Sequence, residues 1–108
     1  MVTYSVVVPV YNEQGNAALL AQDIHAVMEK LGSYEVIFID DGSRDRTVAQ
    51  LKDVKDLHIV QLRRNFGQST ALFAGIEHAK GDIIITMDGD RQNDPRDIPL
   101  PVDKINEG

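Results

Sequence analysis

The stretch Val6-Val7-Val8-Pro9-Val10-Tyr11-Asn12-Glu13 decides the fold, because an apolar run in it passes directly into a polar cluster. Residues 6–10 are almost all β-branched, as expected of a strand that is covered on both faces. The same change from apolar to polar recurs at residues 36–43, 57–65 and 83–90. Four strands are therefore predicted, and a polar cluster follows each of them.

Segments with helical spacing of apolar residues separate these strands. Helices are predicted from about Gly15 to Leu31, from Asp45 to Asp53 and from Ser69 to Ala79, with a fourth from Pro95 to Glu107. This alternation predicts an α/β fold in one domain, residues 1–108, with a parallel sheet, right-handed crossovers and helices on both faces. Ligands of such sheets bind beyond the carboxyl ends of the strands, so we expect the four polar clusters to form one site.

The composition narrows the class of protein. Hydrophobic residues make up 43% of the 108 residues, which suits a folded domain, and the net charge is −6. An acidic chain disfavours nucleic acid as a partner, although a bound cation could still hold the phosphates of a nucleotide. The absence of cysteine excludes disulfides and thiolate metal sites. No apolar run approaches the roughly 20 residues that span a bilayer, and no signal peptide is visible, so the expected location is cytoplasmic.

Asp88 and Asp90 give the sharpest chemical signal. Two carboxylates separated by one residue, just beyond an apolar strand, can point to the same side of a loop and share a hard cation. Mg²⁺ or Mn²⁺ accepts one or two carboxylates and takes further ligands from water and phosphate oxygens. The alternative is that Asp88-Gly89 forms a hairpin turn. Residues 91–95 offer no return strand, so the metal interpretation is favoured.

The cluster Asp40-Asp41-Gly42-Ser43 admits two interpretations. It could be only a turn in which Ser43 or Asp45 caps the next helix. Alternatively, Asp41 accepts hydrogen bonds from the base or ribose of a nucleotide, as acidic groups do near strand ends in nucleotide-binding folds.

The two remaining clusters also admit two interpretations each. Asn12 could cap the first helix, whereas Tyr11 could stack on a base and Glu13 could contact the nucleoside. Arg63 and Arg64 are most simply solvated surface charges, and the alternative is that one of them contacts a phosphate or the lipid acceptor. The three histidines share no ligand spacing and are interpreted as incidental.

Four segments together resemble a known family. They are Val8–Glu13, Ile39–Thr47, Arg64–Gln68 and Thr86–Pro95, which occur in order and with matching spacing over nearly the whole chain. The sequence is similar to family 2 glycosyltransferases of GT-A fold, and within them to the branch of dolichyl-phosphate mannose synthases and bacterial polyprenyl-phosphate sugar transferases. Four ordered motifs are far more specific than any single one of them.

The resemblance implies a Rossmann-like GT-A half that binds a nucleotide-sugar, and it implies roles for particular residues. The nucleotide-binding residues that it implies are Pro9, Tyr11, Glu13, Asp41 and Asp88. The ligands that it implies for Mg²⁺ or Mn²⁺ at the diphosphate are Asp88, Asp90 and Gln92. Gly89 replaces the usual alanine and Arg91 the usual leucine. Neither change removes a ligand, although the charge of Arg91 could weaken the metal site.

The activity that the resemblance implies is metal-dependent transfer of a sugar, with inversion, from a nucleotide diphosphate-sugar to an acceptor. In this branch the acceptor is a polyprenyl phosphate, which would place the full-length protein at the cytoplasmic face of a membrane. Family members continue beyond the point where this sequence ends. The chain is therefore expected to be a truncated N-terminal portion that binds nucleotide but is incomplete for catalysis, with no catalytic base identified. Its open sheet edge would invite a homodimer.

Three alternatives belong to other classes. Residues 85–90 superficially resemble the aspartate-nucleophile motif of haloacid dehalogenase-type phosphatases, which need later strands for a lysine and further carboxylates. A phospho-receiver domain has a similar length, but it would want an acidic pair after the first strand, where this chain has Asn12-Glu13. The third alternative is a folded but inert or non-catalytic binding module.

Overall fold

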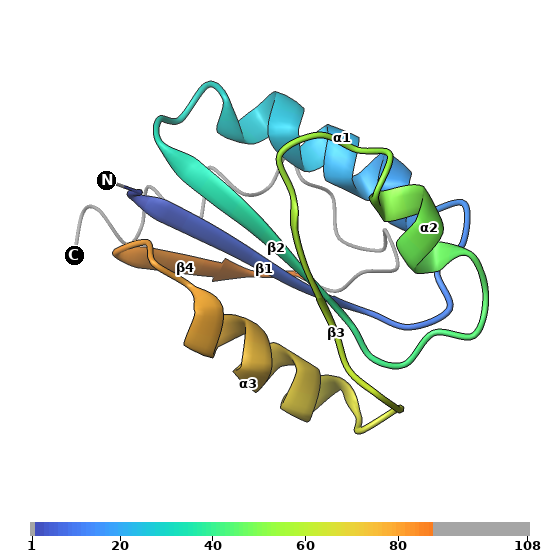
Figure 1. The fold of residues 1–108 in the computed structure, drawn as a ribbon. Coiled ribbons are helices and arrows are strands. Elements are labelled where there is room, and N and C mark those ends of the chain that lie inside the picture. The colour runs from blue at the N-terminus through green and yellow to red at the C-terminus, as the bar shows by residue number, and fades with distance from the viewer. Residues whose placement is uncertain (1, 88–108) are drawn as a thin grey trace.

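The computed structural model describes residues 2–87, which form a four-stranded parallel sheet with helices on both faces (Figure 1). The elements in chain order are β1 (Tyr4–Val10), α1 (Ala17–Met28), β2 (Tyr34–Asp40), α2 (Thr47–Leu51), β3 (His58–Gln61), α3 (Gln68–His78) and β4 (Ile83–Thr86). The predicted α/β class and the alternation of strand and helix are confirmed. The helix that the sequence predicts after Pro95 lies outside the described residues.

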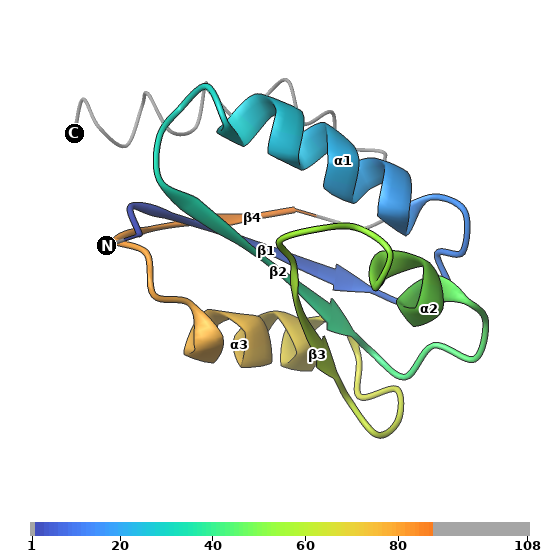
Figure 2. The same cartoon turned by 45° about the horizontal axis from the view of Figure 1, so that its top comes forward.

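The side chains of β1 and β2 alternate between two apolar layers, because successive residues of a strand point to opposite faces. Val6, Val8 and Phe38 pack on the α1 side, together with Leu20 and the other buried side chains of that helix. On the other face Val7, Ile37 and Ile39 pack with Ala71 of α3. Figure 2 shows α1 and α2 on one side of the sheet and α3 on the other. Residues Val6–Val10 of β1 and Val36–Ile39 of β2 are therefore continuous apolar runs.

In the strand order β3-β2-β1-β4, β2 and β3 are added on one side of β1 and β4 on its other side. The strand order therefore reverses between β1 and β4. Both neighbours of β1 are parallel to it, and β3 pairs with β2 rather than with β1. This is the order of a Rossmann-type half, in which the crevice at the reversal binds the ligand. A receiver domain would instead place β1 between β2 and β3. The structure thus excludes the receiver alternative.

Pro9 lies inside a central strand, where proline is rare because it cannot donate to the sheet. The carbonyl of Val7 accepts the N–H of Met87 at 3.1 Å, and that of Val10 accepts the N–H of Asp41 at 2.8 Å. Alternate residues of β1 therefore face β4, and Pro9 is one of them. Pro9 has no N–H with which to extend the β1–β4 ladder beyond this point. The proline is compatible with the fold because of where it stands, at the carboxyl end beside the crevice.

At the opposite, amino edge of the sheet a buried carboxylate ties β1, β2 and the α3–β4 connection together. Glu35 accepts hydrogen bonds from Ser5 Oγ at 2.5 Å and from Lys80 N at 2.6 Å, while His58 Nε2 lies 3.8 Å away. Burial acts to raise the pKa of Glu35, but these hydrogen bonds and the nearby positive charges outweigh it and lower the pKa below its ordinary value. This cluster is structural and lies away from the predicted site.

α1 and α2 are shorter than the sequence predicts, whereas α3 has the predicted length and begins one residue earlier. α1 begins at Ala17 rather than near Gly15, whose N–H donates to Gln50 Oε1 at 2.7 Å instead of to a helical partner. α2 covers only Thr47–Leu51. Within the described residues no helix is long and apolar enough to cross a bilayer.

Candidate functional site

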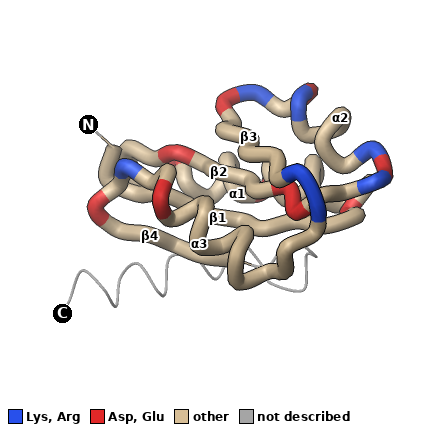
Figure 3. The backbone as a smooth tube through the Cα atoms, turned by 60° about the horizontal axis from the view of Figure 1, so that its bottom comes forward, with Lys and Arg blue, Asp and Glu red and all other residues tan. Residues whose placement is uncertain are grey.

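Three loops meet at the carboxyl edge of the sheet. They are the β1–α1 loop (residues 11–16), the β2–α2 loop (residues 41–46) and the β3–α3 loop (residues 62–67). In Figure 3 the blue segment after β3, which contains Arg63 and Arg64, lies beside the red residues at the end of β2. The predicted convergence of the first three polar clusters is confirmed, because hydrogen bonds join each loop to the next.

The first two loops are joined by what we call the amide clasp, the four backbone N–H groups of residues 12–15 with their side-chain acceptors. Each N–H donates to a different side chain of the β2–α2 segment or α2. The pairs are Asn12 N to Ser43 Oγ at 2.8 Å, Glu13 N to Thr47 Oγ1 at 2.9 Å, Gln14 N to Asp45 Oδ2 at 3.2 Å and Gly15 N to Gln50 Oε1 at 2.7 Å. These four amides are consequently engaged inside the protein.

The clasp is reinforced in the reverse direction. Arg44 N donates to Asn12 Oδ1 at 2.9 Å, and Arg46 N donates to Gln14 Oε1 at 3.1 Å. Asn12 adopts a φ of 51°, a left-handed conformation that asparagine tolerates better than most residues. The N-cap positions of α1 and α2 are Asn16 and Arg46, and neither makes a side-chain capping bond, so the predicted cap positions are wrong. Asp45 nevertheless accepts the N–H of Thr47, the first residue of α2, at 2.9 Å. Asn12 bridges two loops instead.

Asp45 and Thr47 form the centre of the clasp. Thr47 is fully buried, its hydroxyl donates to Asp45 Oδ1, and its N–H donates to the same oxygen at 2.9 Å. Burial acts to raise the pKa of Asp45, but these bonds and the one from Gln14 N outweigh it and lower the pKa below its ordinary value. The motif Asp41-Gly42-Ser43-x-Asp45-x-Thr47 is therefore in large part a device that joins loops.

Asp41 joins the second loop to the third. Its Oδ1 accepts the N–H of Phe66 at 2.8 Å, and its Oδ2 accepts the N–H of Gly67 at 3.0 Å. Only 4% of Asp41 is exposed. A carboxylate offers about four lone-pair positions, so acceptor capacity remains for a ligand that reaches it.

Asp40, the last residue of β2, is 2% exposed. Its Oδ2 accepts the N–H of Ser43 at 3.1 Å, while its Oδ1 has no hydrogen-bond partner among the described residues. A buried carboxylate oxygen without a partner is costly, so water or a ligand donor is needed to satisfy it. The sequence pattern gave Asp40 no role of its own, because its burial and its missing hydrogen-bond partner are visible only in the structure.

The side chains that the resemblance implies at the nucleoside differ in exposure. Tyr11 is 41% exposed and its ring can stack on a ligand, Glu13 is half-buried, and Pro9 is buried within β1. The guanidinium carbon of Arg64 lies 4.8 Å from the centre of the Phe66 ring, a cation–π contact that restrains this exposed arginine. Pro9, Tyr11, Glu13 and Asp41 thus all lie at the carboxyl edge, and their nucleotide-binding roles remain predictions.

The predicted metal ligands Asp88, Asp90 and Gln92 lie outside the described residues. Met87, the last described residue, is held by its N–H to Val7 in the middle of the sheet, and it leads directly into Asp88. Among residues 2–87 no group of three or more His, Asp or Glu side chains could hold a metal ion.

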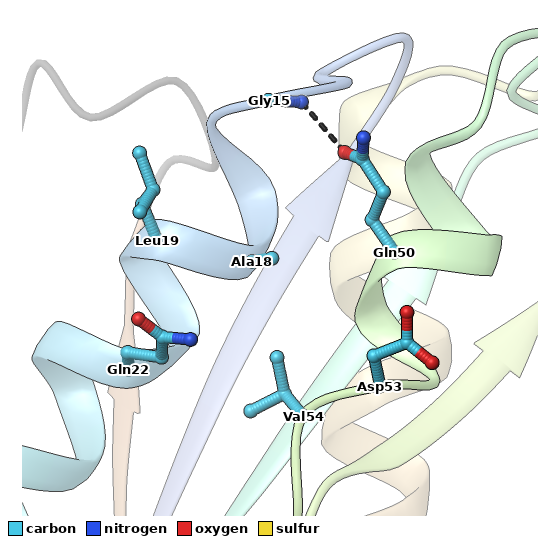
Figure 4. Close-up of a pocket in the computed structure, with 7 residues that line it drawn as sticks. All are labelled: Gly15, Ala18, Leu19, Gln22, Gln50, Asp53 and Val54. Atoms are coloured by element: carbon cyan, nitrogen blue, oxygen red, sulfur yellow. Dashed lines mark hydrogen bonds between the residues drawn. The ribbon is translucent and has the colours of Figure 1, made fainter.

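Two surface hollows lie at some distance from the end of β4. One of about 350 Å³ lies between α1 and α2, where Gln50 points to Gly15 across its end (Figure 4). The other, of about 420 Å³, is at the amino edge and is lined by His25, Tyr34 and Glu35 among others. Neither contains a residue that the sequence predicts for binding. The first one is the outer side of the amide clasp.

Comparison with known proteins gives a consistent family. The sequence profile described as Glycosyl transferase family 2 matches residues 5–108. Undecaprenyl-phosphate 4-deoxy-4-formamido-L-arabinose transferase of Enterobacter sp. (strain 638) is 46% identical over 110 residues, which is 96% of this chain and 34% of that protein. The chain therefore spans about a third of the length of this relative.

Solved structures share the fold. Glucosyl-3-phosphoglycerate synthase from Mycobacterium tuberculosis in complex with UDP superposes with a TM-score of 0.82 at 25% identity, over 98% of this chain and 40% of that one. The same protein with Mn²⁺, UDP and phosphoglyceric acid gives 0.80 at 25% identity, over 95% and 38%. S. aureus TarS 1–349 in complex with UDP-GlcNAc gives 0.78 at 23% identity, over 97% and 31%, a likeness of fold alone.

Proposed function

The chain belongs to glycosyltransferase family 2, and from this premise we propose that its carboxyl edge binds the nucleotide of a nucleotide diphosphate-sugar. The observation that carries the proposal is the convergence of three hydrogen-bonded loops at the strand reversal, next to the end of β4. Tyr11 offers an exposed ring for the base, and Asp40 and Asp41 offer carboxylate oxygens for N–H or hydroxyl donors. Family membership argues against the phosphatase alternative.

The same site is proposed to use Mg²⁺ or Mn²⁺ held by Asp88, Asp90 and Gln92. Two carboxylates and an amide oxygen are ligands that suit a hard divalent cation. The first βα loop of a dinucleotide-binding fold donates amides to the phosphates, but here the amides of residues 12–15 are engaged in the clasp. The diphosphate therefore needs another source of positive charge. The related synthase crystallised with UDP and Mn²⁺ supports this view.

For the whole enzyme we propose transfer with inversion to a polyprenyl phosphate. When bound, the cation would neutralise charge on the leaving diphosphate. The residues of the three loops hold the donor: the clasp fixes the loop of Tyr11 and Glu13, and the buried carboxylates receive ligand donors. A phosphate acceptor is anionic near neutral pH and needs no strong general base. Its lipid chain would bring the reaction to a membrane surface. The name of the Enterobacter relative supports this acceptor class.

For the chain of 108 residues itself we propose nucleotide binding without turnover, because it spans about a third of the relative. A second copy paired at an open edge is a further proposal. Among the described strands, β3 and β4 each have one unpaired side. Light scattering at several concentrations tests it, and a concentration-independent monomer would rule it out.

The central test is calorimetric titration of the chain with UDP and with GDP, with and without Mn²⁺. We expect one of the two to bind, and Mn²⁺ to strengthen its binding at least about tenfold, a gain that Asp90→Ala removes. Asp53→Ala, a change at an exposed carboxylate just beyond the end of α2, is the matched control and should leave the gain intact. Binding that is indifferent to Mn²⁺ and to Asp90→Ala would contradict the metal assignment. Failure of both nucleotides to bind would contradict the function.

A further inference from the structure

We propose that Asp41 is a positioning residue whose carboxylate holds the β3–α3 loop in place for the nucleotide, a connection that we call the latch. The effect on nucleotide binding rests on the proposed function, but the latch itself does not. The alternative is that Asp41 acts only through a direct contact with the nucleoside. The two differ in what they predict for the protein without any ligand.

The hydrogen bonds of Asp41 identify the latch. Its two oxygens accept the N–H groups of the successive residues Phe66 and Gly67, at 2.8 and 3.0 Å. Asp41 is 25 and 26 residues away from them in the sequence, so these bonds connect separate parts of the chain. Bonds to an ionised acceptor are the stronger class of hydrogen bond, and burial of Asp41 protects them from water. Both oxygens of the carboxylate are therefore bonded to the loop before a ligand arrives.

Gly42 supplies independent support for the contact between these two loops. Gly42 has a φ of 78°, and a Cβ placed on it would lie 2.5 Å from the carbonyl carbon of Arg64 and 2.6 Å from the N of Asn65. Both of these are backbone atoms, which cannot rotate away as a side-chain end could. Only glycine lets the backbone of the β2–α2 loop approach that of the β3–α3 loop so closely.

The latched loop sets both the beginning of α3 and the position of an arginine. Gly67 has a φ of 103° and is the N-cap of α3, whose first helical bond is donated by Ala71 N to Gly67 O at 3.1 Å. Phe66, one of the two residues held by Asp41, carries the ring on which Arg64 stacks. Asp41 thus fixes the start of the helix together with the arginine at the carboxyl edge. Loss of the hydrogen bonds to Asp41 would therefore release Arg64, Phe66 and Gly67 together.

The experiment measures amide hydrogen exchange by ¹⁵N NMR and nucleotide affinity by calorimetry with Mn²⁺ present, using UDP, or GDP if the wild type binds that nucleotide instead. Four proteins are compared: wild type, Asp41→Asn, Gly42→Ala and the exposed control Asp53→Asn. Asn keeps the size of Asp41 but loses the charge and one acceptor. Gly42→Ala displaces the same loop without altering the carboxylate. We expect the amides of Phe66 and Gly67 to be protected in the ligand-free wild type and the control. In Asp41→Asn and in Gly42→Ala the Phe66 amide should exchange about tenfold faster or more. The Gly67 N–H also has Asn65 Oδ1 as an acceptor at 3.0 Å, so it is the less sensitive reporter.

The affinity arm then asks whether the loop matters to the ligand. Both Asp41→Asn and Gly42→Ala should weaken nucleotide binding about tenfold or more, because both release the same loop. Unprotected Phe66 and Gly67 amides in the wild type would overturn the latch, and this result needs no variant to fold. An Asp41→Asn protein that loses affinity with unchanged exchange, beside a Gly42→Ala protein of normal affinity, would also overturn it. If the wild type binds no nucleotide, the proposed function fails, while the exchange data still decide the latch.

Discussion

Replacement of Thr47 by valine tests the amide clasp, because valine keeps the shape of threonine and replaces its hydroxyl by a methyl group. Thr47 is fully buried, its Oγ1 accepts the N–H of Glu13 at 2.9 Å, and it donates to Asp45. The variant leaves the Glu13 amide and the Asp45 carboxylate each without one partner. Both groups are part of the site, so the substitution should affect the stability of the domain and the geometry of the site together.

The size of the effect can be worked out from the lost bonds. An intramolecular hydrogen bond contributes about 1 kcal/mol net, and a buried donor left without a partner costs about 1–3 kcal/mol. Glu13 is half-buried, so we expect Thr47→Val to lower the free energy of unfolding by about 2 kcal/mol. Thr47→Ser keeps the hydroxyl and loses one buried methyl, which should cost about 1 kcal/mol. Thr70→Val, on the exposed side of α3, should stay within about 0.5 kcal/mol of wild type.

Urea denaturation gives the three free energies, and hydrogen exchange of the Glu13 amide reports on the clasp directly. In thermal unfolding a loss of about 2 kcal/mol corresponds to a fall in Tm of about 8–16 °C for a domain of this size. The reasoning fails if Thr47→Val is as stable as Thr47→Ser and the Glu13 amide keeps its protection. In that case the Thr47 hydroxyl would contribute no more to the free energy of unfolding than the Thr47 methyl group does.

Three further changes test separate parts of the structure. Gly75→Ala should lower the free energy of unfolding by about 1–2 kcal/mol, because a Cβ there would meet the stiff side chain of Val7; a gain, as helix propensity alone predicts, would contradict this packing. Glu35→Gln should cost stability above the ordinary pKa of glutamate, and its deficit relative to wild type should shrink as the pH falls through the lowered pKa of Glu35; a pH-independent deficit in urea titrations argues against that shift. Arg64→Gln should weaken binding of UDP more than of uridine, whereas Arg63→Gln, without the ring contact, should have the smaller effect; equal losses for both ligands would exclude a phosphate contact.

The sheet could be predicted from sequence because its determinants are local. Val6–Val10 and Val36–Ile39 are apolar runs of β-branched and aromatic residues, and only a parallel sheet covered on both faces buries such runs completely. The polar clusters after each run mark the carboxyl edge for the same reason. Strand boundaries were less accurate, since β1 begins at Tyr4 and β2 ends at Asp40. Both extensions depend on pairing between strands, which one strand's sequence does not reveal.

The hydrogen bonds that join the loops of the site could not be predicted in this way, because they connect residues 25 to 35 positions apart. Asp45 and Asn12 have side chains that commonly cap helices, and local rules therefore assigned them to caps. In the structure Asn12 Oδ1 accepts an N–H of another loop, while Asp45 divides its oxygens between Gln14 N of another loop and Thr47 at the start of α2. Gln50 carried no signal, since a helical glutamine is ordinary, and Thr47 was noted only as the end of a family motif. The polar residues that follow successive strands indicated the region but not the partners.

The charged side chains at the carboxyl edge balance among the described residues. The carboxylates there are Glu13, Asp40, Asp41 and Asp45, and the guanidinium groups are Arg44, Arg46, Arg63 and Arg64. The amides that usually face phosphates in the first βα loop are already bonded, so a diphosphate at this edge needs an arginine or a cation as its partner. We expect the motif Asp88-x-Asp90, which follows β4 in the sequence, to hold such a cation. The net charge of −6 is therefore no argument against a phosphate ligand.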